Sequence, residues 1–391
     1  MGGMPEPAVV VTGKGEARVL RGHPWVFRSD VARSDAATPG AVVRVIGPRG
    51  RPLGFAFHSS RSEIRLRVFA HGESLPADFL RQRLVEAVRW RETIAADAEA
   101  CRLVHGEGDG LPSLVVDRYG NYLVVQTLSQ ATEALKDRIV ETLVELLHPR
   151  GVLERNDPRV RELEGLERRV SLLYGEVPDL VPVEFGGVRF EADLWKGQKT
   201  GLFLDQRENH LMSRGYARGR VLDAFTYNGG FALQVAARAT EVLAVDVSAE
   251  SVARVRANAA LNGATNVTAR EGNVFDVLQE LVRAGERFDT IVLDPPAFAK
   301  NKASVPNALA GYKEINLRAM RLLSPSGCLV TCSCSYNVNE AMFEGVLHEA
   351  SLDSHTPLTV IEKRMQGRDH PVLVGVPETH YLKCFILRRV E

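Results

Sequence analysis

The chain has 391 residues, of which 45% are hydrophobic and 25% are charged, and its formal net charge at pH 7 is zero. This composition is typical of folded, water-soluble proteins and excludes a disordered or fibrous chain, while the length favours two or three domains. No apolar run approaches the ~20 residues of a membrane helix, and the N-terminus lacks the pattern of a secretory signal. We therefore expect a cytoplasmic protein with no membrane partner.

The charge is unevenly distributed along the chain. Residues 1–70 carry eleven Lys or Arg against five Asp or Glu, and the rest of the chain balances this excess. A basic module of this kind suits contact with nucleic-acid phosphates, although a solvated basic face explains the excess equally well. The five cysteines are odd in number, and we expect reduced thiols.

Residues 1–75 are predicted to form a small β-barrel. Short apolar runs separated by Gly, Pro and Ser are typical of strands joined by turns. The candidate RNA contacts in this domain are Lys14, Arg21 and Arg28. The expected strands cover residues 8–13, 25–27, 41–47, 53–58 and 63–70.

Residues 76–182 are predicted to form a central α+β domain without a reactive group of residues. A helical spacing of apolar residues covers residues 77–96, and a second one runs from Leu135 to Leu146. A hairpin is expected around Tyr119-Gly120-Asn121, and further strands at 151–156 and 170–175. A hairpin over 183–194 then leads into the last domain, residues 183–391.

From Arg220 onward, predicted strands and helices alternate, which is the signature of a doubly wound, mainly parallel sheet. The predicted fold class is therefore α/β, with a Rossmann-like sheet in the C-terminal domain. The expected strands are 220–225, 241–247, 267–273, 288–294 and 327–335, and the expected helices are 231–239, 251–263 and 315–323.

Two acids follow the first two strands of this sheet. In open α/β sheets the ligand lies beyond the carboxyl ends of the strands. Asp223 precedes a turn containing Gly229 whose spacing matches neither dinucleotide nor phosphate loops, and its carboxylate suits an ammonium group better than a phosphate. Asp246 is placed to accept hydrogen bonds from a ribose. Together they fit S-adenosylmethionine, although Asp246 could simply serve the cap of the next helix.

The fourth strand is followed by Asp294-Pro295-Pro296-Ala297-Phe298. The prolines stiffen the loop, so that the carboxylate of Asp294 could accept a hydrogen bond from a cytosine and Phe298 could stack on a base. The alternative is an ordinary turn with Phe298 in the core.

The fifth strand ends in Thr331-Cys332-Ser333-Cys334-Ser335. A thiolate that adds to carbon 6 of cytosine activates carbon 5 for methylation. Only about 3% of an ordinary thiol is ionised at neutral pH, so cationic help from Lys300 or Lys302 would be needed. For Cys328, burial in the strand is the simpler interpretation. For Cys332, both burial and a role as a reactive thiol stay open. A metal site is disfavoured because no second Cys or His pair lies at ligand spacing.

These motifs make the chain resemble the bacterial ribosomal RNA cytosine-5 methyltransferases of the RlmI type. The resemblance covers nearly the whole length. It includes residues 21–27 and 60–67, which resemble the opening and the close of the family's RNA-binding PUA module, and residues 196–207, 311–316 and 369–371.

The resemblance implies that Cys334 is the nucleophile and Asp294 the acid that orients the base. It also implies a cofactor pocket for S-adenosyl-L-methionine, and a 23S ribosomal RNA partner, free or in an assembling large subunit. Asn273 departs from the acid expected near the adenine, although its carbonyl can still accept a hydrogen bond. The cofactor candidates are Gln206, Arg207, Asp223, Phe225, Thr226, Asn228, Gly229, Asp246, Ser248, Asn273 and Asp294, and the RNA candidates are Phe298, Lys300 and Lys302 besides those of the barrel.

Other functions remain open at this stage. An RNA methyltransferase acting on N7 or N2 of guanine would share the fold and Asp-Pro-Pro but would need no cysteine. A DNA adenine methyltransferase would place an aromatic residue where Ala297 stands. A ribosome-assembly factor that binds RNA without catalysis is a third possibility, and methylation of a small molecule is opposed mainly by the basic N-terminal module. The target nucleotide and the oligomeric state are not specified.

Overall fold

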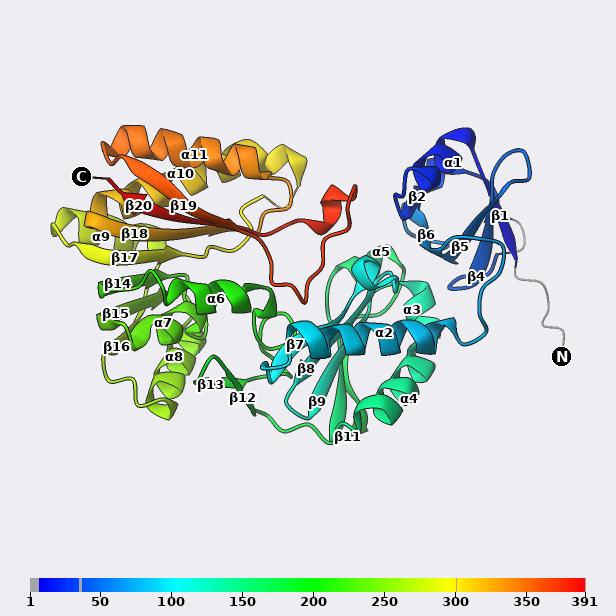
Figure 1. Cartoon of the computed structure of the whole chain (residues 1–391), viewed down its shortest axis with the longest axis horizontal. Coiled ribbons are helices and arrows are strands. Elements are labelled where there is room, and N and C mark those ends of the chain that lie inside the picture. Colours follow the sequence, from blue (N-terminus) through cyan, green and yellow to red (C-terminus); the bar gives the residue numbers. More distant parts are fainter. Residues whose placement is uncertain (1–6, 35–36, 300, 391) are drawn as a thin grey trace. The chain divides into compact units, whose positions relative to one another are not determined.

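A computed structural model describes residues 7–34, 37–299 and 301–390 of the chain (Figure 1). The chain divides into two compact units. Unit 1 comprises residues 1–183, 192–202 and 368–379, and unit 2 comprises residues 184–191, 203–367 and 380–391. The three predicted domain boundaries stay a prediction.

Unit 1 begins with a six-stranded sheet of order β2-β6-β5-β4-β1-β3. Along β4, buried and partly exposed residues alternate, so that Val43 and Val45 join Val9 and Leu66 in one core. The predicted N-terminal β domain is thus confirmed. Its strands are β1 (Ala8–Val11), β2 (Trp25–Phe27), β3 (Val31–Arg33), β4 (Val42–Ile46), β5 (Pro52–His58) and β6 (Ile64–Ala70).

A short helix in this module, α1 (Gly13–Leu20), was not expected from the sequence. Its two glycines have low helix propensity, and it buries only Gly15 and Val19. Thr12 caps it by accepting a hydrogen bond from the amide of Gly15 (3.2 Å). A Cβ atom on Gly15 would lie 2.7 Å from the carbonyl oxygen of Asp30, so the close packing that fixes this helix requires glycine.

The rest of unit 1 is built on a five-stranded sheet of order β11-β10-β9-β8-β7, next to which lie α2 and α4. The predicted helices and the β8–β9 hairpin are confirmed here. Leu80, Leu84, Ile139 and Leu143 form one apolar core with the sheet. The elements are β7 (Ala100–His105), β8 (Leu114–Tyr119), β9 (Tyr122–Thr127), β10 (Gly151–Asn156), β11 (Arg169–Gly175), α2 (Phe79–Ile94), α3 (Gln130–Ala134), α4 (Lys136–Leu147), α5 (Val160–Leu163) and the short 3-10 turn η2 (Gly106–Asp109), while the 3-10 turn η1 (Arg28–Asp30) belongs to the N-terminal module.

Two distant segments of the chain complete unit 1. Thr200 donates a hydrogen bond to the buried carboxylate of Asp117 (2.6 Å) and lies 3.0 Å from the hydroxyl of Tyr119. The carboxylate of Asp369 accepts from the amide of Arg102 (3.0 Å), and its carbonyl accepts from the guanidinium of Arg91 (2.9 Å). Buried hydrogen bonds of this kind fix residues 192–202 and 368–379 to the β7–β8 region.

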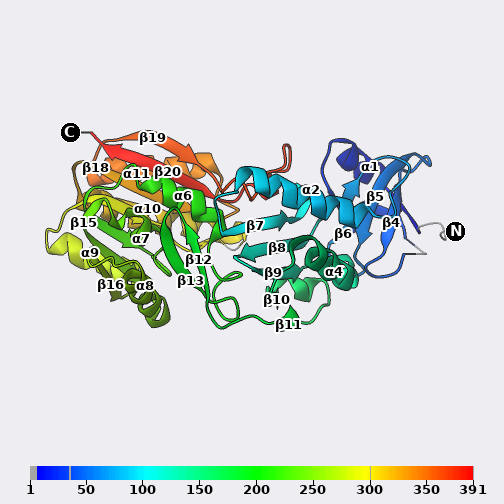
Figure 2. The same cartoon turned by 60° about the horizontal axis from the view of Figure 1, so that its bottom comes forward.

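Unit 2 is built on a seven-stranded sheet of order β16-β15-β14-β17-β18-β20-β19 (Figures 1 and 2). The five strands from β16 to β18 are parallel, and β20 and β19 are antiparallel. The predicted α/β class and the parallel strands are confirmed, whereas β19 and β20 were not predicted. The strands are β14 (Gly219–Ala224), β15 (Ala239–Asp246), β16 (Val267–Glu271), β17 (Phe288–Leu293), β18 (Leu323–Ser333), β19 (Leu358–Arg364) and β20 (Lys383–Arg389), and the small hairpin β12 (Val181–Phe185) and β13 (Val188–Ala192) precedes them.

Helices cover both faces of this sheet. Leu222 belongs to one core with α9, α10 and α11, and its neighbour Val221 belongs to another core with α7 and α8. Helix α10 begins at Val305, ten residues before the predicted start, and Pro306 lies in its first turn, where proline is tolerated. The helices are α6 (Arg207–Ser213), α7 (Gly230–Ala236), α8 (Ala249–Leu261), α9 (Val274–Arg283), α10 (Val305–Leu322) and α11 (Glu340–Ser354), with 3-10 turns η3 (Leu204–Gln206) and η4 (Lys302–Ser304).

Candidate active site

The carboxyl ends of four parallel strands in unit 2 bring the predicted site residues to one edge of the sheet. In the register of β14, Asp223 pairs with Ala244 of β15 and with Val292 of β17. Asp246 ends β15, Asp294 follows β17, and Cys334 follows β18. The strand ends therefore gather three acids and one thiol where open α/β sheets bind their ligands.

Asp223 is fully buried, and one of its carboxylate oxygens has no hydrogen-bond partner among the described residues. The other oxygen, Oδ2, accepts from the hydroxyl of Thr226 (2.6 Å) and from the amide of Ala232 (2.9 Å). Burial raises the pKa of Asp223 to about 7, against the lowering effect of these two hydrogen bonds. A buried acid with a free acceptor oxygen is a candidate binding group for a cation.

The turn between β14 and α7 has an unusual backbone. Phe225 (φ +66°), Tyr227 (φ +52°) and Gly229 (φ +89°) all lie in the left-handed region. Such conformations cost about 1–3 kcal/mol each in residues other than glycine, and they concentrate at functional sites. Asn228, between the last two, is buried, and its carbonyl accepts a hydrogen bond from Asn258 (3.1 Å).

Asp246 fixes the backbone on both sides of the same edge. Its Oδ2 accepts from the amide of Tyr227 (2.9 Å), and its Oδ1 accepts from the amide of Ser248 (2.9 Å). Ser248 is the residue that caps α8, through its own hydroxyl. Each carboxylate oxygen of Asp246 still has a second lone pair for a ligand hydroxyl.

Asn273 caps α9, and its side-chain carbonyl accepts from the amide of Phe275 (2.9 Å). The residue is exposed. Its carbonyl therefore already has one partner, and a second lone pair is left for a ligand amine.

Gln206 and Arg207 lie at the start of α6, and both are buried. The amide of Gln206 donates to Oδ1 of Asp294 (2.8 Å) and accepts from Asn209 (2.6 Å). Nε and Nη2 of Arg207 have no hydrogen-bond partner among the described residues, and the nearest carboxylate, that of Glu208, is 3.9 Å away. Arg207 thus offers buried donors suited to an anionic group.

Cys334 lies half-buried just beyond β18, next to the Asp-Pro-Pro loop. Its Sγ is 3.6 Å from the carbonyl oxygen of Pro295. The next residue, Ser335, accepts from the amide of Ala299 (3.1 Å) and lies 2.8 Å from the hydroxyl of Tyr312. These contacts hold the thiol-bearing segment against the loop that carries Asp294.

Phe298 is packed among aromatic residues. Its ring centroid is 4.6 Å from that of Tyr312, 6.1 Å from that of Phe275 and 6.5 Å from that of Phe225. It is partly exposed. Much of the Phe298 ring is therefore packed in the core, as the alternative interpretation expected, and its stacking on a base stays a prediction.

The other two cysteines of β18 face different surroundings. Cys332 is fully buried opposite Cys384 of β20, and burial raises the pKa of the Cys332 thiol well above its usual range. The pKa of Cys328 is also raised by burial. Neither is disposed to ionise, whereas Cys334 lies in the site.

Lys383, which the sequence analysis missed, lies beside Cys334. It is the first residue of β20 and pairs with Ser333. Its side chain is 2% exposed, and its ammonium donates to the carbonyls of Ser335 and Tyr381 (both 2.8 Å). The sequence suggests Lys300 or Lys302 as the cation near the thiol. Lys302 is exposed, and Lys300 lies outside the described residues. No motif could have found Lys383, because β20 joins the sheet from the far end of the chain.

The RNA candidates of unit 1 lie on the surface. Lys14 is 3.4 Å from the carboxylate of Asp30. Arg28 donates to the carbonyl of Arg61 (2.8 Å), and Arg21 is exposed at the C-terminal cap of α1. The structure brings them to one module but does not test their role.

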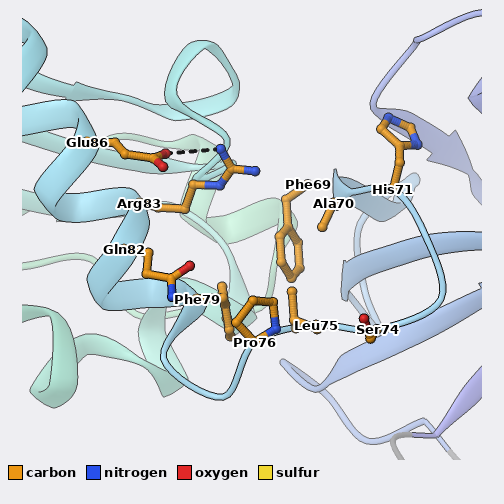
Figure 3. Close-up of a pocket in the computed structure, with 10 residues that line it drawn as sticks. All are labelled: Phe69, Ala70, His71, Ser74, Leu75, Pro76, Phe79, Gln82, Arg83 and Glu86. Carbon is orange, nitrogen blue, oxygen red and sulfur yellow. Dashed lines mark hydrogen bonds and ion pairs between the residues drawn. The ribbon is translucent and has the colours of Figure 1, made fainter.

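A separate open pocket of about 250 Å³ lies in unit 1 where β6 leads into α2 (Figure 3). Phe69 and Phe79 stack at its wall with centroids 5.1 Å apart, and Arg83 reaches toward Glu86. It contains no cysteine and no paired carboxylates, so it offers no second set of catalytic groups. In the part of the chain that the structure describes, no cluster of three or more His, Cys, Asp or Glu is placed to hold a metal ion, and no helix is long and apolar enough to cross a membrane.

Comparison with known proteins identifies the class. Residues 166–377 match the S-adenosylmethionine-dependent methyltransferase family, and residues 9–71 match the PUA-like domain. A methyltransferase solved in complex with SAH has the same fold, with a TM-score of 0.84 and 22% identity over 98% of this chain and 100% of that one. A SAM-dependent methyltransferase from Streptococcus mutans gives a TM-score of 0.82 at 21% identity, with the same coverage. Fold and site thus define an S-adenosylmethionine-dependent methyltransferase with an N-terminal PUA-like domain.

Relatives over the whole length narrow this further. A protein of Shigella boydii is 38% identical over 390 residues, covering 97% of this chain and 98% of the relative. One of Tolumonas auensis is 39% identical over 388 residues, covering 96% and 97%. Both are named ribosomal RNA large subunit methyltransferase I. The chain belongs to the ribosomal RNA large subunit methyltransferase I family, as the sequence motifs predicted.

Proposed function

We propose that this protein methylates carbon 5 of a cytosine in 23S ribosomal RNA, in the cytoplasm, through a transient bond between Cys334 and carbon 6 of the base. The relatives' name supports large-subunit ribosomal RNA as the substrate. The observation that carries the cytosine chemistry is the position of Cys334 at the edge of the sheet, 3.6 Å from the Asp-Pro-Pro loop.

The residues of the site fit S-adenosylmethionine. Its methionyl part carries an ammonium and a carboxylate. Among the described residues, Oδ1 of Asp223 and Nε and Nη2 of Arg207 have no hydrogen-bond partner, so they can receive these two groups. Asp246 is held by two backbone amides with lone pairs left for ribose hydroxyls. When bound, the cofactor supplies an electrophilic methyl group.

On the substrate side, Asp294 is the acceptor that orients the base. One of its oxygens accepts from Gln206, which leaves acceptor capacity for the cytosine amine or a protonated ring nitrogen. Phe298 belongs to the same loop, and its ring is the candidate for stacking on a base that has left the RNA stack. The loop's Ala299 donates to Ser335, which is also bonded to Tyr312, and these contacts keep the base-binding acid and the thiol in one rigid group.

Cys334 supplies the nucleophile. Carbon 5 of cytosine becomes nucleophilic only after a thiolate has added to carbon 6, and the bond to Sγ breaks again after carbon 5 has lost its proton. The half-buried thiol of Cys334 is accessible for this addition, whereas the thiol of Cys332 is enclosed in the core.

The test is methylation of ribosomal RNA from cells that lack the protein, with tritiated S-adenosylmethionine, followed by nucleoside analysis. Wild type should yield labelled 5-methylcytosine, Cys334→Ala none, and the control Cys332→Ala an amount close to that of wild type. RNA containing 5-fluorocytosine should form a stable covalent complex with wild type and with Cys332→Ala only. Labelled guanine made equally well by Cys334→Ala would overturn the proposal in favour of a guanine methyltransferase.

A further inference from the structure

A buried lysine that the steps above leave unused lies next to the proposed nucleophile. Lys383 is 2% exposed, and it belongs to no ion pair with a carboxylate within the described ranges. Burying an amine without a counter-ion is costly, so such a lysine marks a functional position more often than a structural one.

The geometry directs this amine toward Cys334. Residue 383 pairs with Ser333 across the sheet, and its Nζ is hydrogen-bonded to the carbonyl of Ser335. The cysteine lies between these two residues in the chain. A second carbonyl, that of Tyr381, takes another hydrogen of the amine. A neutral amine has two hydrogens and one lone pair, so with both hydrogens donated to the two carbonyls the lone pair is left to accept a proton.

We propose that Lys383 is the general base that takes up and holds the proton of Cys334 during the reaction. This inference rests on the proposed cysteine mechanism and adds a residue to it. As Sγ attacks, the S–H bond breaks, the proton passes to the neutral amine of Lys383, and the sulfur electron pair forms the bond to carbon 6. When that bond breaks, the pair returns to Sγ, and Lys383 gives the proton back.

The electrostatics agree with this role. Burial lowers the pKa of Lys383 to about 8, and the thiolate of Cys334 opposes that lowering. An amine with this pKa is partly neutral near neutral pH and can accept a proton from a thiol, whose ordinary pKa is about 8.5. Among the described residues, the other titratable groups near the thiol are Asp294 of the adjacent loop, the phenol of Tyr312, whose pKa is raised by burial, and Tyr381, whose hydroxyl donates to Asp205. None of these offers a cation.

The experiment is the pH dependence of alkylation of Cys334 by iodoacetamide, followed by mass spectrometry of the Cys334 peptide without RNA. Lys383→Met removes the amine, and Lys383→Gln keeps an N–H donor for the two carbonyls but cannot hold the proton. Lys363→Gln, which removes an exposed lysine of β19, is the matched control. The pH at which alkylation of Cys334 is half-maximal should rise by about one unit or more in both Lys383 variants. This midpoint should stay at the wild-type value in the control.

Turnover gives the second readout. At pH 7 both Lys383 variants should lose about tenfold in kcat with little change in the KM for RNA, and the loss should shrink toward pH 9 as the thiol ionises unaided. Binding of S-adenosylmethionine by calorimetry checks that the variants are folded. A wild-type midpoint in Lys383→Gln would overturn the inference, and a shifted midpoint only in Lys383→Met would assign the residue to structure alone. Full activity of Cys334→Ala would instead refute the cysteine mechanism itself, whatever the midpoint.

Discussion

The side-chain amide of Gln206 donates a hydrogen bond to Oδ1 of Asp294 across 2.8 Å. The orientation of this amide is fixed by its other neighbours. Asn209 donates to the Gln206 oxygen (2.6 Å), and Asn209 itself accepts from Nε of Arg364 (2.8 Å). A chain of three hydrogen bonds therefore fixes which end of the Gln206 amide faces the acid.

Asn209→Asp should weaken catalysis without touching the substrate. A carboxylate at position 209 cannot donate to Gln206, so the Gln206 amide turns and presents its oxygen to Asp294. We expect kcat to fall about tenfold, equivalent to about 1.4 kcal/mol, with the Kd for S-adenosylmethionine changed by less than about twofold. Single-turnover assays with ribosomal RNA measure this. Asn262→Asp, at a surface helix end, is the control, and an unaltered rate in Asn209→Asp would show that Asp294 does not depend on this chain.

Asp223→Asn should stabilise the protein without ligand at alkaline pH. Because the folded pKa of about 7 exceeds the ordinary value of 3.8, the folded state binds the proton more tightly, and stability falls as pH rises between these values. An asparagine keeps the acceptor for Thr226 and Ala232 without the buried charge. We expect the Tm at pH 8 to rise by about 2–4 °C for each kcal/mol of penalty removed, and no rise at pH 4. Calorimetry at the two pH values decides this, and a lower Tm at pH 8 would contradict it.

Binding of S-adenosylmethionine should release a proton from Asp223. An ammonium beside this carboxylate favours its ionised form, so binding competes with protonation below pH 7. In the wild type, the Kd for S-adenosylmethionine should rise about tenfold for each pH unit below 7. In Asp223→Asn, the Kd should be higher than in the wild type but independent of pH. Titration calorimetry in buffers of different ionisation enthalpy counts the protons. Equal pH dependence in both proteins would assign the proton elsewhere.

Arg21→Gln should weaken RNA binding through charge alone. Arg21 is exposed, whereas Lys14 is near the carboxylate of Asp30. Loss of one phosphate contact lowers the slope of log affinity against log salt by about 0.7 for single-stranded RNA. Filter binding at several salt concentrations measures the slope. Arg81→Gln, whose arginine pairs with Glu145 on the surface, should leave it unchanged.

The strands that carry the site could be predicted because buried parallel strands have continuous apolar runs in the sequence. Asp223, Asp246, Asp294 and Cys334 each follow such a run, and the register of the sheet brings them to one edge. Each of these residues lies at the end of a strand that the local sequence pattern identifies, so the pattern is sufficient to place them at one edge of the sheet.

The partners of these residues could not be predicted. Lys383 and Asn209 act through contacts that depend on β20 and on the packing of α6, and neither contact has a local signal. Helix α1 was missed because a Gly-rich helix is held by tertiary packing and not by propensity. The expectation that Lys300 or Lys302 helps the thiol stays a prediction: Lys302 is exposed, and Lys300 lies outside the described residues.

The contacts of Asp369 with Arg91 and Arg102 have a consequence for biosynthesis. Most of unit 1 precedes residue 203, yet residues 368–379 also belong to it. The hydrogen bonds of Asp369 therefore form only after translation has passed residue 369, long after β7 and α2 have been made. A nonsense mutation just before residue 368 should thus leave Arg91 and Arg102 without these bonds and unit 1 incompletely folded, exposed to cellular proteases.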